Sequence, residues 1–195
     1  MMERLLVAAE RLVDACERVG LPYALGGAMA NTYWGIVRTT QDVDCLVHVP
    51  ALRYQALVDE LTRFGFKLRN ESGDEEPLSV AAIRTQEQRD KFFDVYFGGL
   101  RVQVFVPCVP LQTEILRRAV DMPLGARSVK MTTAEDLLLL KMSFHRQKDL
   151  LDVRGILRVQ SAKLDLGYVR RWSAQMLTDE VQQELEQMIQ EAKTS

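Results

Sequence analysis

The chain is poor in the residues that build disulfide frameworks and zinc sites. It has three cysteines, Cys16, Cys45 and Cys108, and two histidines among 195 residues. No two cysteines have the Cys-x-x-Cys spacing of zinc and redox motifs, so reduced thiols are the simplest interpretation. We therefore expect reduced thiols in the core, no zinc site and a cytoplasmic location.

Long apolar runs and an excess of basic residues are also absent from the sequence. The apolar runs are much shorter than the ~20 residues of a membrane span, and residues 1–20 form an amphipathic pattern without a signal-peptide cleavage site. We expect no membrane partner. The sequence has 25 Lys and Arg residues and 27 Asp and Glu residues, which gives a net charge of −2. This balance disfavours tight non-specific binding of nucleic acid, although it does not exclude nucleic acid as a substrate.

The remaining composition is typical of a globular protein, with 47% hydrophobic and 27% charged residues. We expect an α/β core over residues 1–131 and an all-helical region over residues 132–195 that packs on it. Helical spacing of apolar residues occurs over residues 1–20, 50–64, 80–83, 111–120, 134–145, 148–159, 164–176 and 179–192. Strand patterns occur over residues 23–25, 42–49, 66–68, 91–97, 100–106 and 128–131.

Two aspartates on the second predicted strand are the strongest indication of chemistry. Alternate residues on a strand share one face of the sheet, so Asp42 and Asp44 are expected to project together. Carboxylates held side by side repel each other unless a positive charge lies between them. A hard divalent cation, Mg²⁺ or Mn²⁺, is the usual solution, because it takes oxygen ligands and keeps positions open for phosphate.

A Gly-Gly pair between the first strand and the following helix is a candidate phosphate site. Gly26 and Gly27 permit a tight turn and a close approach of the backbone to a ligand. A helix that begins near Ala28 would offer free N–H groups and the positive end of its dipole to a phosphate. The alternative is a glycine helix cap beside an exposed acidic strand end.

The order strand, Gly-Gly turn, helix and Asp-x-Asp strand resembles the DNA polymerase β-type nucleotidyltransferase superfamily. The resemblance implies an α/β (α+β) fold, with a mixed, twisted sheet flanked by helices and an all-α C-terminal part. It also implies metal-dependent nucleotidyl transfer from an NTP to a hydroxyl acceptor. In that scheme Asp42 and Asp44 are catalytic metal ligands, while Gly26, Gly27 and Ala28 bind the triphosphate.

The residues before the aspartates resemble one branch of this superfamily, the AbiEii-like proteins of abortive-infection and toxin–antitoxin systems. The first motif of that branch has an arginine and a threonine at the positions of Arg38 and Thr40. The resemblance implies that both residues bind the nucleotide. It further implies a toxin-like activity on an acceptor such as tRNA or a protein, and an antitoxin protein as partner.

A second motif of the same branch is carried by a leucine-rich helix that Lys141 interrupts, followed by Lys148 and Asp149. The resemblance implies that Lys141 is catalytic, that Lys148 and Asp149 bind the nucleotide, and that one of the lysines neutralises phosphate charge. If one helix continued to Asp152, it would place Lys141 and His145 on the same polar stripe. The alternatives are a Lys141 that reaches solvent along an apolar face and a surface pair of Lys148 with Asp152.

The third carboxylate of the superfamily is missing from the expected strand, where this sequence has Gln103. A hairpin about Gly98 and Gly99 predicts that Asp94 lies directly across from Gln103. Three interpretations stay open. Gln103 is a neutral ligand in the catalytic site, or Asp94 takes the place of the third acid, or the site has decayed into a nucleotide- or partner-binding module. A simple polar pair of Asp94 with Gln103 is a further alternative for Asp94.

Overall fold

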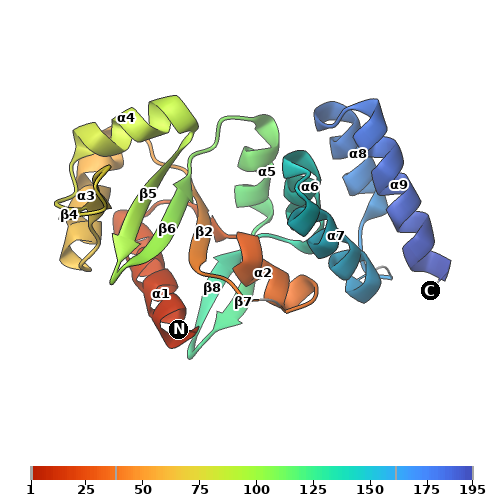
Figure 1. The fold of residues 1–195 in the computed structure, drawn as a ribbon, viewed down its shortest axis with the longest axis horizontal. Helices are drawn as coiled ribbons and strands as arrows, with labels where there is room; N and C mark the ends of the chain where they lie inside the picture. The colour runs from red at the N-terminus through yellow and green to blue at the C-terminus, as the bar shows by residue number, and fades with distance from the viewer. Residues whose placement is uncertain (1, 38, 161, 195) are drawn as a thin grey trace. The chain divides into compact units, whose positions relative to one another are not determined.

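The computed structural model describes residues 2–37, 39–160 and 162–194 (Figure 1). The chain forms two compact units. The first unit comprises Met1–Gly26 and Thr40–Met131, and the second comprises Gly27–Thr39 and Thr132–Ser195. A short segment from the N-terminal part of the chain therefore belongs to the same unit as the C-terminal helices.

The first unit is built on a six-stranded mixed sheet with the order β5-β6-β2-β1-β8-β7 (Figure 1). Its strands are β1 (Tyr23–Leu25), β2 (Asp42–Val47), β5 (Phe92–Phe97), β6 (Leu100–Phe105), β7 (Val120–Leu124) and β8 (Arg127–Met131). Strand β2 runs parallel to β6 and antiparallel to β1. This mixed sheet, with helices beside it, confirms the predicted α/β fold class.

The face of β2 that lies opposite the aspartates belongs to the core of the first unit. On β2 the buried Val43 and Cys45 alternate with the half-buried Asp42 and Asp44, as the period of a strand requires. Helix α1 (Met2–Val19) contacts β2 and β6 and buries an apolar stripe. Burying this stripe fixes the register of β2, because a shift of one residue would turn both aspartates into the core.

The remaining elements of the first unit are short. They are η1 (Ala51–Arg53), α3 (Tyr54–Arg63), β3 (Leu68–Arg69), β4 (Glu75–Glu76), α4 (Val80–Asp90) and α5 (Pro110–Arg118). Helix α4 is much longer than the four residues expected from its apolar pattern. Its ends are set by local hydrogen bonds, with Ser79 accepting from the Ala82 N–H, and only Ile83 is buried. A helix that buries one residue has almost no hydrophobic periodicity by which to predict its length.

Two further expectations for the first unit are wrong. The helix expected to reach residue 120 ends at Arg118, and Val120 begins the hairpin of β7 with β8. Strand β7 is not among the expected strands; it contains Pro123 and forms the edge of the sheet, where proline is tolerated. Of the three free cysteines, Cys108 is exposed and so is not part of the core.

The second unit is helical in its described residues. It contains α2 (Gly27–Trp34), α6 (Ala134–Phe144), α7 (Gln147–Gln160), α8 (Leu166–Met176) and α9 (Asp179–Thr194). The backbone at His145 has a left-handed conformation with φ 52°, which ends α6. The single continuous helix from residue 134 to residue 152 is therefore not formed. His145 instead pairs with Glu184 of α9 through a 2.6 Å contact.

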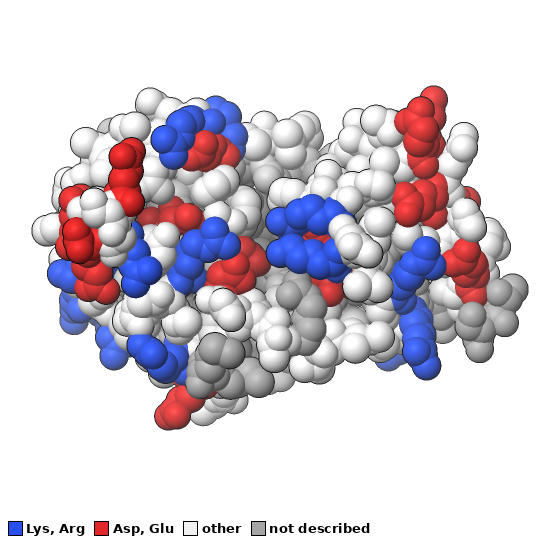
Figure 2. Space-filling view, viewed as in Figure 1, with Lys and Arg blue, Asp and Glu red and all other residues white. Residues whose placement is uncertain are grey.

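Neither sign of charge dominates the visible surface (Figure 2). In the view of Figure 2, basic and acidic side chains are interspersed over both halves of the picture. This distribution agrees with the small net charge of −2. Among the helices of the described residues, none is both long and apolar enough to cross a membrane.

Candidate functional site

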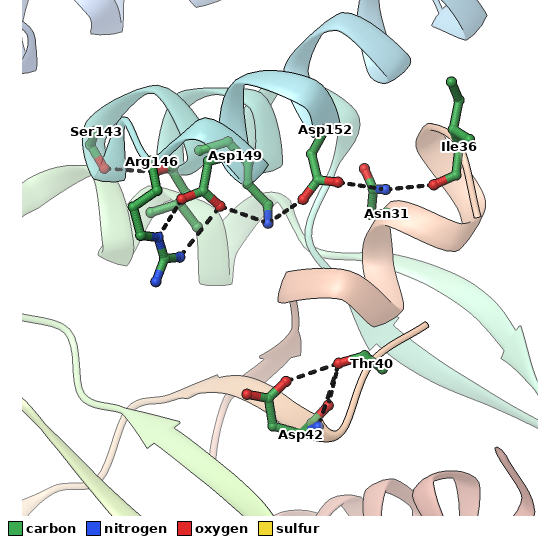
Figure 3. Close-up of polar contacts among 10 residues, drawn as sticks. Asn31, Ile36, Thr40, Asp42, Ser143, Arg146, Asp149 and Asp152 are labelled. Atoms are coloured by element: carbon green, nitrogen blue, oxygen red, sulfur yellow. Dashed lines mark hydrogen bonds and ion pairs between the residues drawn. The ribbon is translucent and has the colours of Figure 1, made fainter. Parts of the chain in front are cut away.

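The two aspartates of β2 lie on one face of the sheet, as the strand pattern predicts. Both side chains are half-buried, and the residues that alternate with them are buried on the opposite face. Thr40 lies just before the strand and fixes the first carboxylate. Its hydroxyl donates to Asp42 Oδ1 over 2.9 Å, and it also accepts weakly from the Asp42 N–H over 3.4 Å (Figure 3). In this structure Thr40 therefore orients a candidate metal ligand.

The hairpin of β5 with β6 has the register predicted from the Gly-Gly turn. Gly98 and Gly99 have φ values of 53° and 85°, the left-handed conformation that a tight hairpin requires. Asp94 lies opposite Gln103, and the Gln103 Nε2 donates to Asp94 Oδ1 over 3.0 Å. Burial raises the pKa of the Asp94 carboxyl above its ordinary value, although the hydrogen bond from Gln103 and the charge of Arg101 oppose the shift.

The parallel pairing of β2 with β6 completes the arrangement. It places Gln103 beside Asp44 and Arg101 beside Asp42. Three polar side chains, Asp44, Gln103 and Asp94, thus form a row across three neighbouring strands. Asp94 lies two strand spacings, about 10 Å, from Asp44 at the backbone. Gln103 is therefore the nearer of the two candidates for the position of a third ligand.

Arg101 is a member of this site that the sequence did not indicate. Its Nη2 contacts Asp42 Oδ2 over 2.7 Å, and its Nη1 lies 3.9 Å from Asp94 Oδ2. The predicted hairpin places Arg101 on the same face as Gln103 because the two residues are two positions apart on β6. Its contact with Asp42 depends on the pairing of β2 with β6, which joins residues 59 positions apart. No local sequence pattern predicts the pairing of β2 with β6.

The donor set of this face fits one hard divalent cation. Asp42 and Asp44 provide carboxylate oxygens, and Gln103 provides an amide oxygen on the adjacent strand. Within the described parts of the chain, no group of three or more His, Cys, Asp or Glu side chains is placed to hold a metal. A second cation would need further carboxylates on β6, where an amide and a guanidinium are found. The residues therefore fit one cation and do not fit two.

The Gly-Gly pair is divided between the two units. The Gly26 N–H donates to the Asp44 carbonyl over 2.9 Å, so it is used in holding β1 against β2. Gly27 begins α2 with φ 55°, a conformation that favours glycine over other residues. Ala28 follows it in the first turn of α2 and is buried. Arg38, the other predicted nucleotide-binding residue near this segment, lies outside the described residues.

Lys141 is buried in a polar cluster of the second unit. Its side chain is 7% exposed, and its Nζ lies 3.1 Å from Asp149 Oδ1 and 2.7 Å from Asp152 Oδ2. Asn31 Nδ2 donates to Asp152 Oδ1 over 3.3 Å and to the Ile36 carbonyl over 2.9 Å (Figure 3). The alternative in which Lys141 reaches solvent is therefore wrong. The cluster joins α6 and α7 to Asn31 of α2 and to Ile36, which follows α2.

Arg146 extends this cluster to the surface. Its Nε donates to Asp149 Oδ2 over 2.5 Å, and the guanidinium is half-exposed while Asp149 is fully buried (Figure 3). Burial alone would raise the pKa of Asp149, but hydrogen bonds from Arg146 and Lys141 outweigh it and hold the pKa below its ordinary value. Lys148, between these residues in sequence, is exposed. The two predicted nucleotide-binding residues of α7 thus lie in opposite environments.

The lowered pKa of Asp149 predicts a defined pH dependence of stability. A carboxyl whose folded pKa is depressed stabilises the fold above its unfolded pKa of about 3.9, and this stabilisation is lost as the pH falls through the folded pKa. The free energy of unfolding should therefore fall less steeply below about pH 5 in Asp149→Asn than in the unmodified protein. Urea denaturation at several pH values measures this slope. Asp59→Asn, at an exposed position of α3, should keep the steeper slope; equal slopes in all three proteins would contradict the assignment.

The fold is similar to those of several solved structures, one of which is named a nucleotidyltransferase-like protein. A crystal structure of ANT(2")-Ia in complex with adenylyl-2"-tobramycin matches with a TM-score of 0.56 and 14% identity, over 88% of this chain and 95% of that chain. A solution structure of the antibiotic-resistance factor ANT(2'')-Ia matches with a TM-score of 0.54 and 13% identity, over 89% and 96%. An antigenic nucleotidyltransferase-like protein from Paracoccidioides brasiliensis matches with a TM-score of 0.52 and 16% identity, over 96% and 93%.

These likenesses establish the fold of the chain. It has the nucleotidyltransferase fold over most of its length. The sequence matches no protein-family model and no curated protein. The structural matches have identities of 13% to 16%, so they support a shared architecture but do not indicate the substrate.

Proposed function

We propose that this protein transfers a nucleotidyl group from an NTP to a hydroxyl acceptor, with one divalent cation held by Asp42 and Asp44. The observation that carries the proposal is the pair of half-buried carboxylates on one face of β2, within a nucleotidyltransferase fold. When bound, Mg²⁺ or Mn²⁺ would neutralise and orient the phosphates of the NTP. Thr40 keeps Asp42 in one orientation, which lowers the entropy cost of forming the metal site.

The other residues that the superfamily resemblance assigns to the nucleotide have distinct proposed roles. Gly27 and Ala28 begin a helix whose N-terminal N–H groups suit a phosphate oxygen, and Gly26 anchors the preceding strand. Of the two lysines, Lys148 is exposed and is the better candidate for a contact with phosphate. Lys141 would have to break two buried ion pairs to make such a contact. We therefore assign Lys141 and Asp149 to the support of α6 and α7.

The acceptor is proposed on chemical grounds alone. The ANT(2")-Ia structure contains an adenylylated aminoglycoside, so that protein holds a small hydroxyl compound that carries a nucleotidyl group. For this chain a small hydroxyl compound, the end of a tRNA and a protein hydroxyl are all compatible with the proposed transfer. A toxin-like role with an antitoxin partner, as in the AbiEii-like branch, is the finer form of the proposal.

The test measures nucleotide binding and transfer separately. Calorimetry with each of the four NTPs should show binding in Mg²⁺ that disappears in EDTA. Incubation with α-labelled NTPs and total RNA, cell protein or aminoglycosides should then move label to one class of acceptor. No NTP binding in saturating Mg²⁺, or equally tight binding in EDTA, would remove the basis of the metal-dependent proposal.

A second candidate function is a non-catalytic module that binds a nucleotide or a partner protein. Gln103 favours it, because an amide occupies the position of the third carboxylate and is engaged with Asp94. The module predicts nucleotide binding without transfer of label, whichever acceptor and metal are supplied. The labelled-NTP experiment therefore separates the two functions.

A further inference from the structure

Arg101 makes the most direct contact with the proposed cation site. Its Nη2 lies 2.7 Å from Asp42 Oδ2, within the range of a charge-assisted hydrogen bond. The two residues are direct partners in the parallel pairing of β2 with β6, so the backbone holds them side by side. The contact is therefore built into the sheet and does not depend on the chance reach of a long surface side chain.

Both oxygens of the Asp42 carboxylate are engaged. Oδ1 accepts from the Thr40 hydroxyl over 2.9 Å, and Oδ2 accepts from Arg101. A cation that approaches Oδ2 would meet a guanidinium of the same charge at hydrogen-bonding distance from that oxygen. Thr40 is neutral and presents no such repulsion. The obstacle to a cation on this carboxylate is therefore Arg101.

The charges around Arg101 favour its present position. The guanidinium is 41% exposed and lies 3.9 Å from Asp94 Oδ2 in addition to its contact with Asp42. Its positive form is stabilised first by the hydrogen bond to Asp42 and then by the charges of Asp94, Asp42 and Asp44, which raise its pKa. These three carboxylates and one guanidinium leave two negative charges in excess. One divalent cation would balance that excess, and a second would overshoot it.

We propose that Arg101 is a built-in counter-cation of this site, which takes the place of a second metal and must release Asp42 before a divalent cation binds. The inference deepens the proposed function and rests on it, because it names the residue that sets the affinity of the cation site. Asp94 gives the displaced guanidinium a second carboxylate within reach. Arg101 is thus a positioning residue, and it controls the site through Asp42.

The test is direct titration of Mn²⁺ by electron paramagnetic resonance, without any nucleotide or acceptor. Arg101→Met removes the competing charge and should bind Mn²⁺ about tenfold more tightly than the unmodified protein, a difference of ~1.4 kcal/mol. Arg101→Gln provides a second neutral variant with the same expectation, in case the methionine variant folds poorly. Arg101→Lys keeps the charge and should stay close to the unmodified affinity.

A matched control separates local competition from overall charge. Arg63 of α3 is an exposed arginine whose Nη1 lies 3.4 Å from Glu60 Oε1. Arg63→Met changes the net charge by the same amount as Arg101→Met. Its Mn²⁺ affinity should equal that of the unmodified protein. Adding Asp44→Asn to Arg101→Met should remove the gained affinity, because the cation would lose a carboxylate ligand. Thermal unfolding of each variant checks that the fold is intact.

The failure of this inference differs from the failure of the proposed function. The counter-cation role is overturned if both neutral variants bind Mn²⁺ no more tightly than the unmodified protein does. The absence of Mn²⁺ binding in every protein also overturns it. If Arg63→Met also binds Mn²⁺ more tightly, the counter-cation role of Arg101 is overturned as well, because the gain would then come from the change in net charge. Tighter binding in the Arg101 variants alone supports it, even if no NTP is bound and no label is transferred. That last pattern would remove the proposed transfer and leave the cation site.

Discussion

Asp44→Asn is expected to lower nucleotidyl transfer by about a thousandfold, which corresponds to ~4 kcal/mol of lost transition-state stabilisation. The physical reason is the charge of the ligand, because affinity for a hard cation depends on the number of carboxylates around it. Asparagine keeps the size of the side chain and its half-buried position on β2. The loss should therefore come with little change in stability. Single-turnover transfer of label from an NTP, with saturating Mg²⁺, measures the effect.

The control for this experiment is Asp59→Asn, which removes the same charge from an exposed position on α3. It should transfer label at the unmodified rate. Mn²⁺ titration of Asp44→Asn should show a matching loss of cation affinity. If Asp44→Asn transfers label normally, or loses transfer while it binds Mn²⁺ as before, the aspartate pair is not the cation site and the one-cation mechanism fails.

Lys141→Met is expected to destabilise the protein by about 3 kcal/mol, at the lower end of the cost of breaking a buried ion pair. Lys141 is 7% exposed, and the two carboxylates that it contacts are 0% and 4% exposed. Without the lysine, Asp152 would keep the neutral hydrogen bond from Asn31, and Asp149 would keep the ion pair with Arg146. Methionine fits the volume of the lysine stem but offers no charge. Urea denaturation, followed by circular dichroism, measures the free energy of unfolding.

Two variants make the Lys141 result specific. Lys148→Met removes an exposed lysine from the neighbouring helix and should change the free energy of unfolding by less than about 0.5 kcal/mol. Lys141→Met combined with Asp152→Asn removes one charge of each sign and should recover part of the lost stability. A Lys141→Met protein as stable as the original would show that the buried cluster carries little of the stability of this unit. Such a result would favour a direct role of Lys141 with the nucleotide.

Local patterns were sufficient for the parts of the site that lie within one strand or one hairpin. The period of a strand placed Asp42 and Asp44 on one face, and the two glycines at positions 98 and 99 fixed the pairing of Asp94 with Gln103. Both inferences depend on residues a few positions apart, where the geometry of the backbone leaves few alternatives. Helix α4 is the counterexample, since one buried residue provides no period to detect.

The partners of the charged residues were decided by tertiary structure. The sequence by itself determined a nucleotidyltransferase-like order of elements, the aspartate pair and the absence of a third acid on β6. Only the parallel pairing of β2 with β6 brought Arg101 to Asp42, and only the turn at His145 folded Asp149 and Asp152 onto Lys141. The physical reason is that the sequence records a charged residue identically in every environment. Whether it meets solvent, a cation or an opposite charge depends on which distant segment packs beside it.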